Sequence, residues 1–269
     1  MRQQSSLARL LASAAVTAIL AAGLGGCQTM SDITGSISPK PTSIAETDPR
    51  KAAEIAGERY RANPKSAEAA LAYGQALRTT GQRSQAVAVL EQATIGHPGD
   101  KALLAAYGRA LADNGNFQMA FDILSRAHTP ENPDWRILSV QGTALDQLGR
   151  HDDARRYYAS ALKIVPDEPT VLSNLGLSYL LSKNLPKAEE VLRQAYAGKG
   201  ADARVRQNLA LVIGLQGRFA EAEQIVRADL PPEEAAANVA YLKQMLDRKD
   251  DPRGAATRKM PMASLNRPE

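Results

Sequence analysis

Residues with well-known catalytic or metal-binding chemistry are few and scattered in this sequence. Cys27 is the single cysteine, which excludes an internal disulfide and a Cys-rich zinc or iron–sulfur site. His97, His128 and His151 show neither the HxxxH nor the HExxH spacing that places two imidazoles on one helix face. No GxSxG or P-loop pattern is present, and nothing in the sequence places a Ser/His/Asp set together. We therefore predict no catalytic residues, no metal site and no cofactor.

The segment before Cys27 has the features of a secretory signal. Arg2 and Arg9 lie near its start without an acidic residue, and residues 10–24 are apolar apart from small and hydroxyl-bearing side chains. This run is shorter than the roughly 20 residues that a membrane-spanning helix needs, and it has the size of a signal-peptide core. It ends at Leu24-Gly25-Gly26-Cys27, so that small residues directly precede the cysteine.

The sequence Leu24–Cys27 resembles the bacterial lipobox, in which a Leu and two small residues precede an invariant Cys. The resemblance implies that Cys27 is acylated and that residues 1–26 are a signal peptide, cut just before it. Gln28, in place of Asp, implies a lipoprotein of the outer membrane that faces the periplasm. Residues 27–48 are rich in Ser, Thr, Pro and Gly, which predicts a flexible tether. The alternative is an ordinary secretory signal with a chance cysteine, or an uncleaved anchor.

The composition favours closely packed helices over one bulky core. Apolar residues make up 44% of the 269 residues, yet aromatic residues make up only 4%, and 47 residues are Ala. Alanine is the strongest helix former, and its small side chain lets helices approach closely. The net charge of +4, without a basic patch interleaved with base-stacking aromatic residues, argues against a nucleic-acid partner.

A 34-residue period runs through the middle of the chain. Glycine recurs at this spacing, with alanine in the fifth place: Gly74, Gly108, Gly142, Gly176 and Ala210. Seven residues later, a second column reads Gly81, Gly115, Gly149, Lys183 and Gly217. A third column contains only alanine: Ala86, Ala120, Ala154, Ala188 and Ala222. A fixed period of this length indicates a repeated supersecondary unit.

Each unit is predicted to be two helices joined by a turn. Tyr73, Gly74 and Leu77 share one face of the first helix, and Ala86 and Leu90 share one stripe of the second. The glycine of the second column supplies the turn between them. Small residues in the first and third columns let the two helices approach closely, and larger side chains would overpack the crossing.

This pattern resembles the tetratricopeptide repeat. The resemblance covers residues 67–236 and implies an all-α superhelix, or α-solenoid, of about five helix-turn-helix repeats. Asp48-Pro49 predicts an N-cap and a first helical turn, which opens a flanking helix over Pro49–Ala62 within residues 49–66. A capping helix with a polar outer face is expected over residues 237–248, and residues 249–269 are expected to be disordered.

The resemblance also implies that the first helices line a concave groove that binds proteins. The candidate partner-binding residues are Gln75, Arg78, Arg109, Arg136, Asn174, Arg204, Gln207 and Asn208. The carboxamides of Asn174 and Asn208 can clamp a peptide backbone, although Asn is also simply frequent at that place in the family. The arginines can pair with acidic groups of a ligand or form a solvated face. The Lys and Asn residues that grip a C-terminal carboxylate in chaperone-binding relatives are absent.

The lipobox, tether and repeats together resemble the lipoproteins of tight-adherence (Flp) pilus assembly, the TadD type, as does the stretch Ala237–Leu242. This resemblance implies a lipid-anchored scaffold that binds a pilus or secretin component and assists secretin assembly in secretion. Rivals of similar architecture are the pilotins of type IV pili, outer-membrane protein insertion factors and exopolysaccharide-export scaffolds. An enzyme with a non-standard site, or a cytosolic adaptor that retains residues 1–26, is a different class of answer. No small-molecule substrate is expected.

Overall fold

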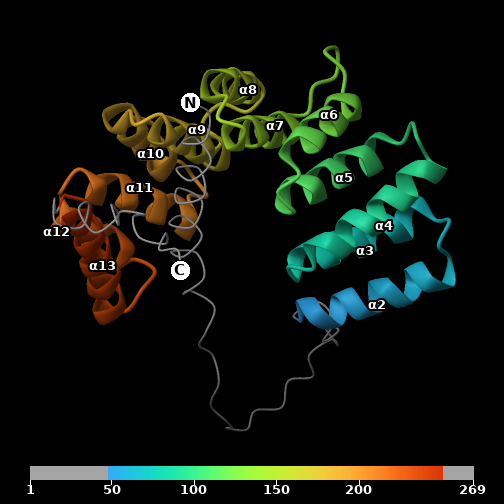
Figure 1. Cartoon of the computed structure of the whole chain (residues 1–269), viewed down its shortest axis with the longest axis horizontal. Coiled ribbons are helices and arrows are strands. Elements are labelled where there is room, and N and C mark those ends of the chain that lie inside the picture. Colours follow the sequence, from blue (N-terminus) through green and yellow to red (C-terminus); the bar gives the residue numbers. More distant parts are fainter. Residues whose placement is uncertain (1–47, 251–269) are drawn as a thin grey trace, which may run out of the picture. The chain divides into compact units, whose positions relative to one another are not determined.

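The computed structural model describes residues 48–250, with side chains as far as residue 248. Within that range twelve α-helices follow one another and none of the segments is a β-strand (Figure 1). None of these helices is both long enough and apolar enough to cross a membrane. The predicted signal peptide, Cys27, the tether before Asp48 and the tail after Asp250 lie outside the described residues.

Ten of the helices form five pairs at the predicted period. The first helices of the pairs are α3 (Ala67–Thr79), α5 (Lys101–Asp113), α7 (Trp135–Gln147), α9 (Pro169–Leu181) and α11 (Ala203–Leu215). The second helices are α4 (Arg83–Gly96), α6 (Phe117–Ala127), α8 (His151–Ile164), α10 (Leu185–Ala197) and α12 (Phe219–Val226). They are flanked by α2 (Pro49–Ala62) and α13 (Pro232–Asp250).

The first helices begin at side-chain caps, which fix where each unit starts. Ser66 Oγ accepts a hydrogen bond from the backbone N–H of Ala69 at 3.1 Å, and Asp100 Oδ1 accepts one from Ala102 at 2.9 Å. The same role falls to Asp134, Glu168 and Asp202 at the starts of α7, α9 and α11. These oxygens satisfy N–H groups that have no partner inside the helix.

The turn between the two helices of a unit requires a left-handed backbone. Gly81, Gly115, Gly149 and Gly217 adopt φ values between 75° and 85°. Only glycine enters this region without a steric penalty from a Cβ atom. In the fourth unit Lys183 holds the same position at a φ of 63°, so this unit carries a strained turn that the others avoid.

The glycines of the first column lie where the two helices of a unit cross. A Cβ added at Gly74 would lie 2.6 Å from Cγ of Leu90, and one at Gly108 would lie 2.5 Å from Cγ of Leu124. In the fifth unit Ala210 replaces the glycine, and the corresponding residue of α12 is the smaller Val226. The predicted close crossing is confirmed, and the size of the second-helix residue follows the space that the first helix leaves.

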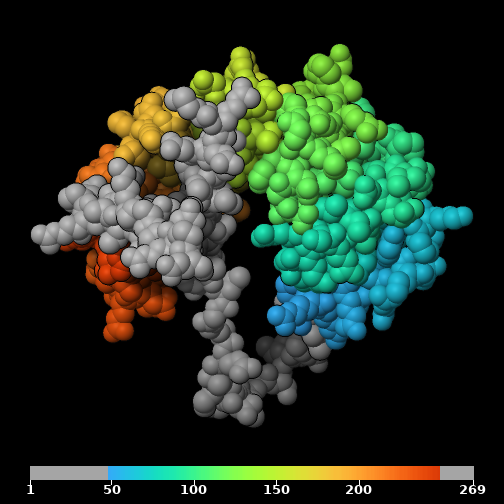
Figure 2. All heavy atoms as spheres, in the orientation of Figure 1, coloured from blue at the N-terminus to red at the C-terminus, as the bar shows by residue number. Residues whose placement is uncertain are grey.

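Successive units are joined through their first helices. From α5 onward, each first helix contacts both helices of the preceding unit, as α5 does with α3 and α4. The second helices of neighbouring units are further apart and meet through side chains, as Phe121 of α6 does with Tyr157 of α8, with 5.6 Å between the ring centroids, and Arg193 of α10 with Glu221 of α12. The first helices therefore form the inner row of the stack, and we call their solvent-facing surface the inner face. Side chains of successive helices from α2 to α6 meet in a continuous surface (Figure 2).

The helix α2 covers the start of the array. It buries Ala53 and Ala56 against α3, and its Tyr60 stacks on Tyr73 with 5.7 Å between the ring centroids. Its opposite side carries exposed charged residues, including Lys51 and Glu58. A charged outer side of this kind closes a repeat array to further stacking.

The other end of the array differs from the boundaries expected from the sequence. The capping helix α13 begins at Pro232 rather than at residue 237, so the last residues assigned to the repeats belong to the cap. Leu242 of α13 fills the space beside Gly214 of α11, where an added Cβ would lie 2.5 Å from Cδ2 of Leu242. The cap therefore packs directly on α11, one helical turn after the crossing of Ala210 with Val226.

Candidate functional site

The inner face changes character along the array, and its first half is charged. Arg78 on α3 donates from Nε to Asp113 Oδ2 on α5 at 2.6 Å, which ties two neighbouring first helices together. Arg136 is exposed, and its guanidinium lies 4.4 Å from the centroid of the Trp135 ring. Gln75 is exposed on the same side of the array. Of the predicted groove residues, Arg78 is thus already used in an ion pair.

Arg109 lies on α5 in this charged half of the inner face, and its side chain is half-buried. Burial lowers the pKa of its guanidinium, and the nearby Arg78 and Arg136 act in the same direction, whereas Asp134 and Asp113 oppose them. No carboxylate of residues 48–248 lies within 4 Å of its nitrogen atoms. Arg109 is therefore surrounded by charge but has no direct ionic partner in this part of the chain.

The second half of the inner face carries partly exposed aliphatic side chains. Leu177 and Leu180 on α9 and Leu211 on α11 are only partly buried, and Leu181 is 41% exposed. Large aliphatic side chains that the core does not enclose are available to a partner. Leu177, Leu180 and Leu211 hold positions that the repeat resemblance turns toward the groove, but the candidate residues predicted from the sequence are all polar and do not include them.

The two asparagines lie within this second half, and both link neighbouring first helices. Asn174 Nδ2 donates to Ser139 Oγ at 3.1 Å, and Asn208 Nδ2 donates to Ser173 Oγ at 2.9 Å. Both serines are 5% exposed. One end of each carboxamide is therefore used within the fold, and only the other end is available to a partner.

The remaining predicted residues lie on α11. Arg204 is exposed and donates from Nε to Asp202 Oδ2 at 3.1 Å, beside the cap of the helix. Gln207 is half-buried next to Asn208. The structure therefore places the eight predicted residues on the first helices, but in two separate groups of different chemistry.

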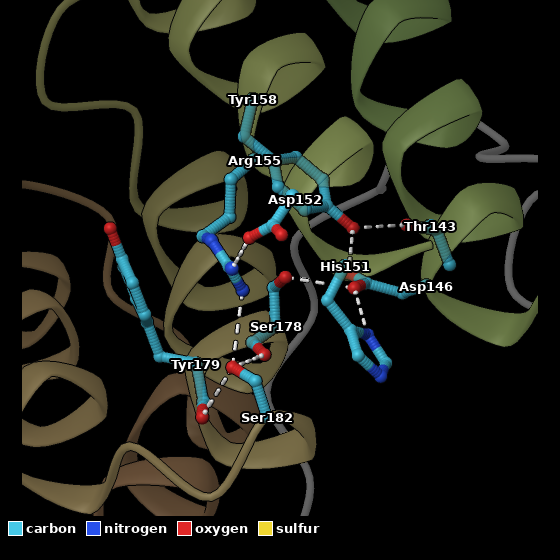
Figure 3. A network of polar contacts seen from close by, with 9 residues as sticks. All are labelled: Thr143, Asp146, His151, Asp152, Arg155, Tyr158, Ser178, Tyr179 and Ser182. Atoms are coloured by element: carbon cyan, nitrogen blue, oxygen red, sulfur yellow. Dashed lines mark hydrogen bonds and ion pairs between the residues drawn. The ribbon is translucent and has the colours of Figure 1, made fainter. Parts of the chain in front are cut away.

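A buried polar network lies between the two halves (Figure 3). The side chain of Asp146 on α7 is 5% exposed and accepts three hydrogen bonds. The donors are Ser178 Oγ at 2.8 Å, the Tyr158 hydroxyl at 3.0 Å and His151 Nδ1 at 2.8 Å. Burial, together with the negative charge of Asp146, raises the pKa of Tyr158 well above its usual value. The network joins α7, α8 and α9 through a single carboxylate.

This network places a Ser/His/Asp set together, contrary to the expectation from the sequence. The arrangement is nevertheless unlike a catalytic triad, because Ser178 donates to the carboxylate and not to the imidazole. The Ser178 side chain is also fully buried. A nucleophile must contact its base and reach a substrate, so the geometry assigns this set to packing. Among the residues described, no three His, Cys, Asp or Glu side chains form a metal-binding group.

Three family models of the tetratricopeptide repeat match the chain, over residues 67–110, 140–203 and 203–228. The chain is therefore a tetratricopeptide-repeat protein, and the predicted all-α solenoid is confirmed. Repeats of this type are protein-interaction scaffolds, and none of the matching models describes a catalytic family. No curated protein matches the chain.

Solved structures of low sequence identity share the fold. PilW, described as a widely conserved type IV pilus biogenesis factor, is 18% identical with a TM-score of 0.63, over 72% of this chain and 92% of PilW. TTC0263, a thermophilic repeat protein of Thermus thermophilus, is 22% identical with a TM-score of 0.58, over 66% of this chain and 100% of its own. A chain of the APC/C hetero-tetramer Cut9–Hcn1 is 18% identical with a TM-score of 0.60 over 79% of this chain. The match spans 42% of the length of that chain.

Proposed function

We propose that this protein is a lipid-anchored scaffold of the cell envelope that holds a protein subunit of a pilus or secretion machine during assembly. The lipid would be attached to Cys27, and the repeats would face the periplasm from the outer membrane. The lipobox-like sequence Leu24–Cys27 and the tether-like composition of residues 27–48 support this placement. Among envelope machines we favour the tight-adherence (Flp) pilus, with its secretin as the component that is assembled.

The observation that carries the scaffold function is a contrast between the two sides of the array. On the second helices, the charges of Arg193, Arg218, Glu189 and Glu221 are paired with one another. On the inner face, Arg109 has no ionic partner among the described residues, and Leu177 and Leu211 remain partly exposed. The inner face therefore keeps an unpaired cation and apolar side chains for a partner, although the second helices also expose single apolar side chains such as Ile95 and Met119.

The fold of PilW supports a place in pilus assembly. PilW is itself a pilus biogenesis factor and shares the arrangement of helices over most of its length. An array of repeats offers a long surface to an elongated or unfolded partner. A lipid-anchored array would hold such a subunit next to the membrane that it enters.

Photo-crosslinking in cells tests the proposal. A photoreactive amino acid replaces Leu211 on the inner face, and a matched variant carries it at Lys163, which is exposed on the second helix α8. We expect an adduct with a secretin or pilus subunit, identified by mass spectrometry, from position 211 and not from position 163.

Other adducts separate the alternatives. A pilotin-dependent secretin of a type IV pilus, an outer-membrane insertion component or a polysaccharide exporter would each replace the tight-adherence assignment and keep the scaffold function. The same adducts from position 163 as from position 211 would overturn the assignment of the inner face.

A further inference from the structure

The charged half of the inner face has an excess of positive charge. Three arginines meet there from three successive first helices: Arg78 on α3, Arg109 on α5 and Arg136 on α7. Two carboxylates, those of Asp113 and Asp134, lie among them. The group therefore carries one more positive than negative charge, and its side chains belong to the inner face.

Both carboxylates in this group are already in use. Asp113 accepts the hydrogen bond from Arg78 at 2.6 Å. Asp134 caps α7, where its Oδ1 accepts a hydrogen bond from the backbone N–H of Arg136 at 2.7 Å. Arg109 is left as the half-buried guanidinium to which no described carboxylate is committed. A guanidinium in this situation gains most from a carboxylate that arrives with a partner, because charge-assisted pairs are stronger away from bulk water.

Two first helices beyond α5, the inner face offers aliphatic side chains in place of the arginines. Leu177 and Leu180 on α9 and Leu211 on α11 offer partly exposed aliphatic surface, and the charged residue of the candidate site on these two helices, Arg204, is paired with Asp202. Neighbouring first helices are in contact, and packed helix axes lie about 8–10 Å apart, so Arg109 and Leu177 are separated by roughly 16–20 Å. An extended chain covers that distance in about five or six residues.

We propose, building on the scaffold function above, that the inner face takes an extended segment of a partner protein with an acidic residue at one end and leucine-like residues five or six positions away. The acidic residue pairs with Arg109, and the apolar residues contact Leu177, Leu180 and Leu211. A ligand with only one of these chemistries leaves half of the surface unused. The order of the arginines and the aliphatic side chains also fixes which end of the segment lies over α5 and which lies over α9 and α11.

Synthetic peptides test this selectivity on the full-length protein in detergent. The probe is a fluorescent decapeptide with two aspartates, a Ser/Gly spacer and two leucines five or six residues from the aspartates, made in both chain directions. One control peptide has lysine in place of the aspartates, and a second has serine in place of the leucines. Fluorescence anisotropy gives the Kd of each peptide.

We expect the better of the two directions to bind roughly tenfold or more tightly than either control. Arg109→Gln should weaken this peptide roughly tenfold and leave the lysine control unaffected. Leu211→Ser should weaken binding of the peptide with aspartates and leucines, whereas the Kd of the control peptide with serine in place of the leucines should change little. Arg156→Gln is the matched variant, since Arg156 is exposed on the second helix α8 and paired with Asp153, and should bind like the unchanged protein. Circular dichroism of each variant establishes that the helices are intact.

Two results would overturn the proposal: equal affinity for the aspartate and lysine peptides, or unchanged affinity in Arg109→Gln. The crosslinking experiment keeps this failure apart from failure of the scaffold function. An adduct from position 211 with a secretin or pilus subunit, together with unselective peptides, retains the scaffold and rejects the acidic-apolar segment. If the crosslinked adduct and the peptide selectivity are both absent, the scaffold function is rejected as well.

Discussion

The ring of Tyr158 lies directly against Gly142, so closely that a Cβ added at Gly142 would be 2.5 Å from Cε1 of the tyrosine. The tyrosine is 1% exposed, and its hydroxyl donates to Asp146. Its side chain is therefore held at both ends. The same crossing in the other units holds an aliphatic residue, so the third unit alone combines a close fit with a polar anchor.

Gly142→Ala should therefore destabilise the protein by about 1–3 kcal/mol, because the added methyl group overpacks the crossing. The free energy of unfolding from urea denaturation measures this. Gly96→Ala is the control: Gly96 lies at the end of α4 with open space around its missing Cβ. There alanine should be neutral or stabilising by up to about 1 kcal/mol. Equal stability of Gly142→Ala and Gly96→Ala would contradict the tight crossing.

Lys183→Gly should stabilise the protein by about 1 kcal/mol, because Lys183 has a left-handed φ of 63° that costs a residue with a Cβ atom. The reverse change, Gly149→Lys, puts the same strain into the third unit at a φ of 77° and should lower the melting temperature. Opposite shifts of the two melting temperatures are the expected result. Shifts of the same sign would show that backbone strain does not control this turn.

The double change of Asn174 and Asn208 to Ala should lower stability as well as affect any bound partner. Each substitution leaves a nearly buried serine hydroxyl without its partner, at a cost of about 1–3 kcal/mol. Thermal unfolding of the single and double variants measures the loss. Gln75→Ala, at an exposed position of the same face, should leave the melting temperature unchanged. An unaffected melting temperature in the double variant would remove the structural role of the asparagines.

Acid should weaken the junction between α10 and α12. The hydrogen bond from Arg218, with those from Gln216 and Arg193, lowers the pKa of Glu189 to about 2 from an ordinary 4.5. Because the folded-state pKa is the lower one, this contribution is fully present above about pH 4.5 and is lost as the pH falls toward 2. Glu189→Gln should therefore lose less stability than the unchanged protein between pH 5 and 2. Parallel pH profiles of unfolding would contradict this role.

Cys27→Ser should abolish lipid attachment and leave the chain at precursor size, because the hydroxyl cannot replace the thiol that is acylated. Metabolic labelling with a palmitate analogue, combined with membrane fractionation, measures both effects. Gln28→Ser serves as the control and should be processed normally. A labelled, mature-sized Cys27→Ser protein in the outer-membrane fraction would reject the lipobox interpretation.

The sequence was sufficient for the repeat architecture, because its period depends on side-chain size. The columns of Gly and Ala indicate where helices cross, and the regular spacing of Gly81, Gly115 and Gly149 indicates where the turns lie. The fold class and the unit boundaries follow from such residues without knowledge of the packing. The start of α13 was missed although Pro231-Pro232 marks it, since proline is favoured in the first turn of a helix.

The polar contacts could be predicted less well, because they depend on which side chains meet between units. The serine partners of Asn174 and Asn208 lie 35 residues before them, one residue away from the 34-residue period that the columns follow. Asp146 looks like a surface residue in the sequence and is instead the buried acceptor for three donors. The sequence identified Arg109 as a candidate, but only the structure shows that the acids beside it are already engaged.

The way in which neighbouring units meet has a mechanical consequence. Each junction passes through a first helix, which packs on both helices of the unit before it, while the second helices of neighbouring units meet through side chains, such as Phe121 with Tyr157 and Arg193 with Glu221. Such a junction can bend about the axis of the first helix that belongs to the later unit. Small rotations about this axis change the spacing of the second helices and leave the contacts between the first helices in place. We expect an array of such junctions to be elastic, so that a scaffold of the proposed kind can follow a bound chain that bends and keep its contacts with it.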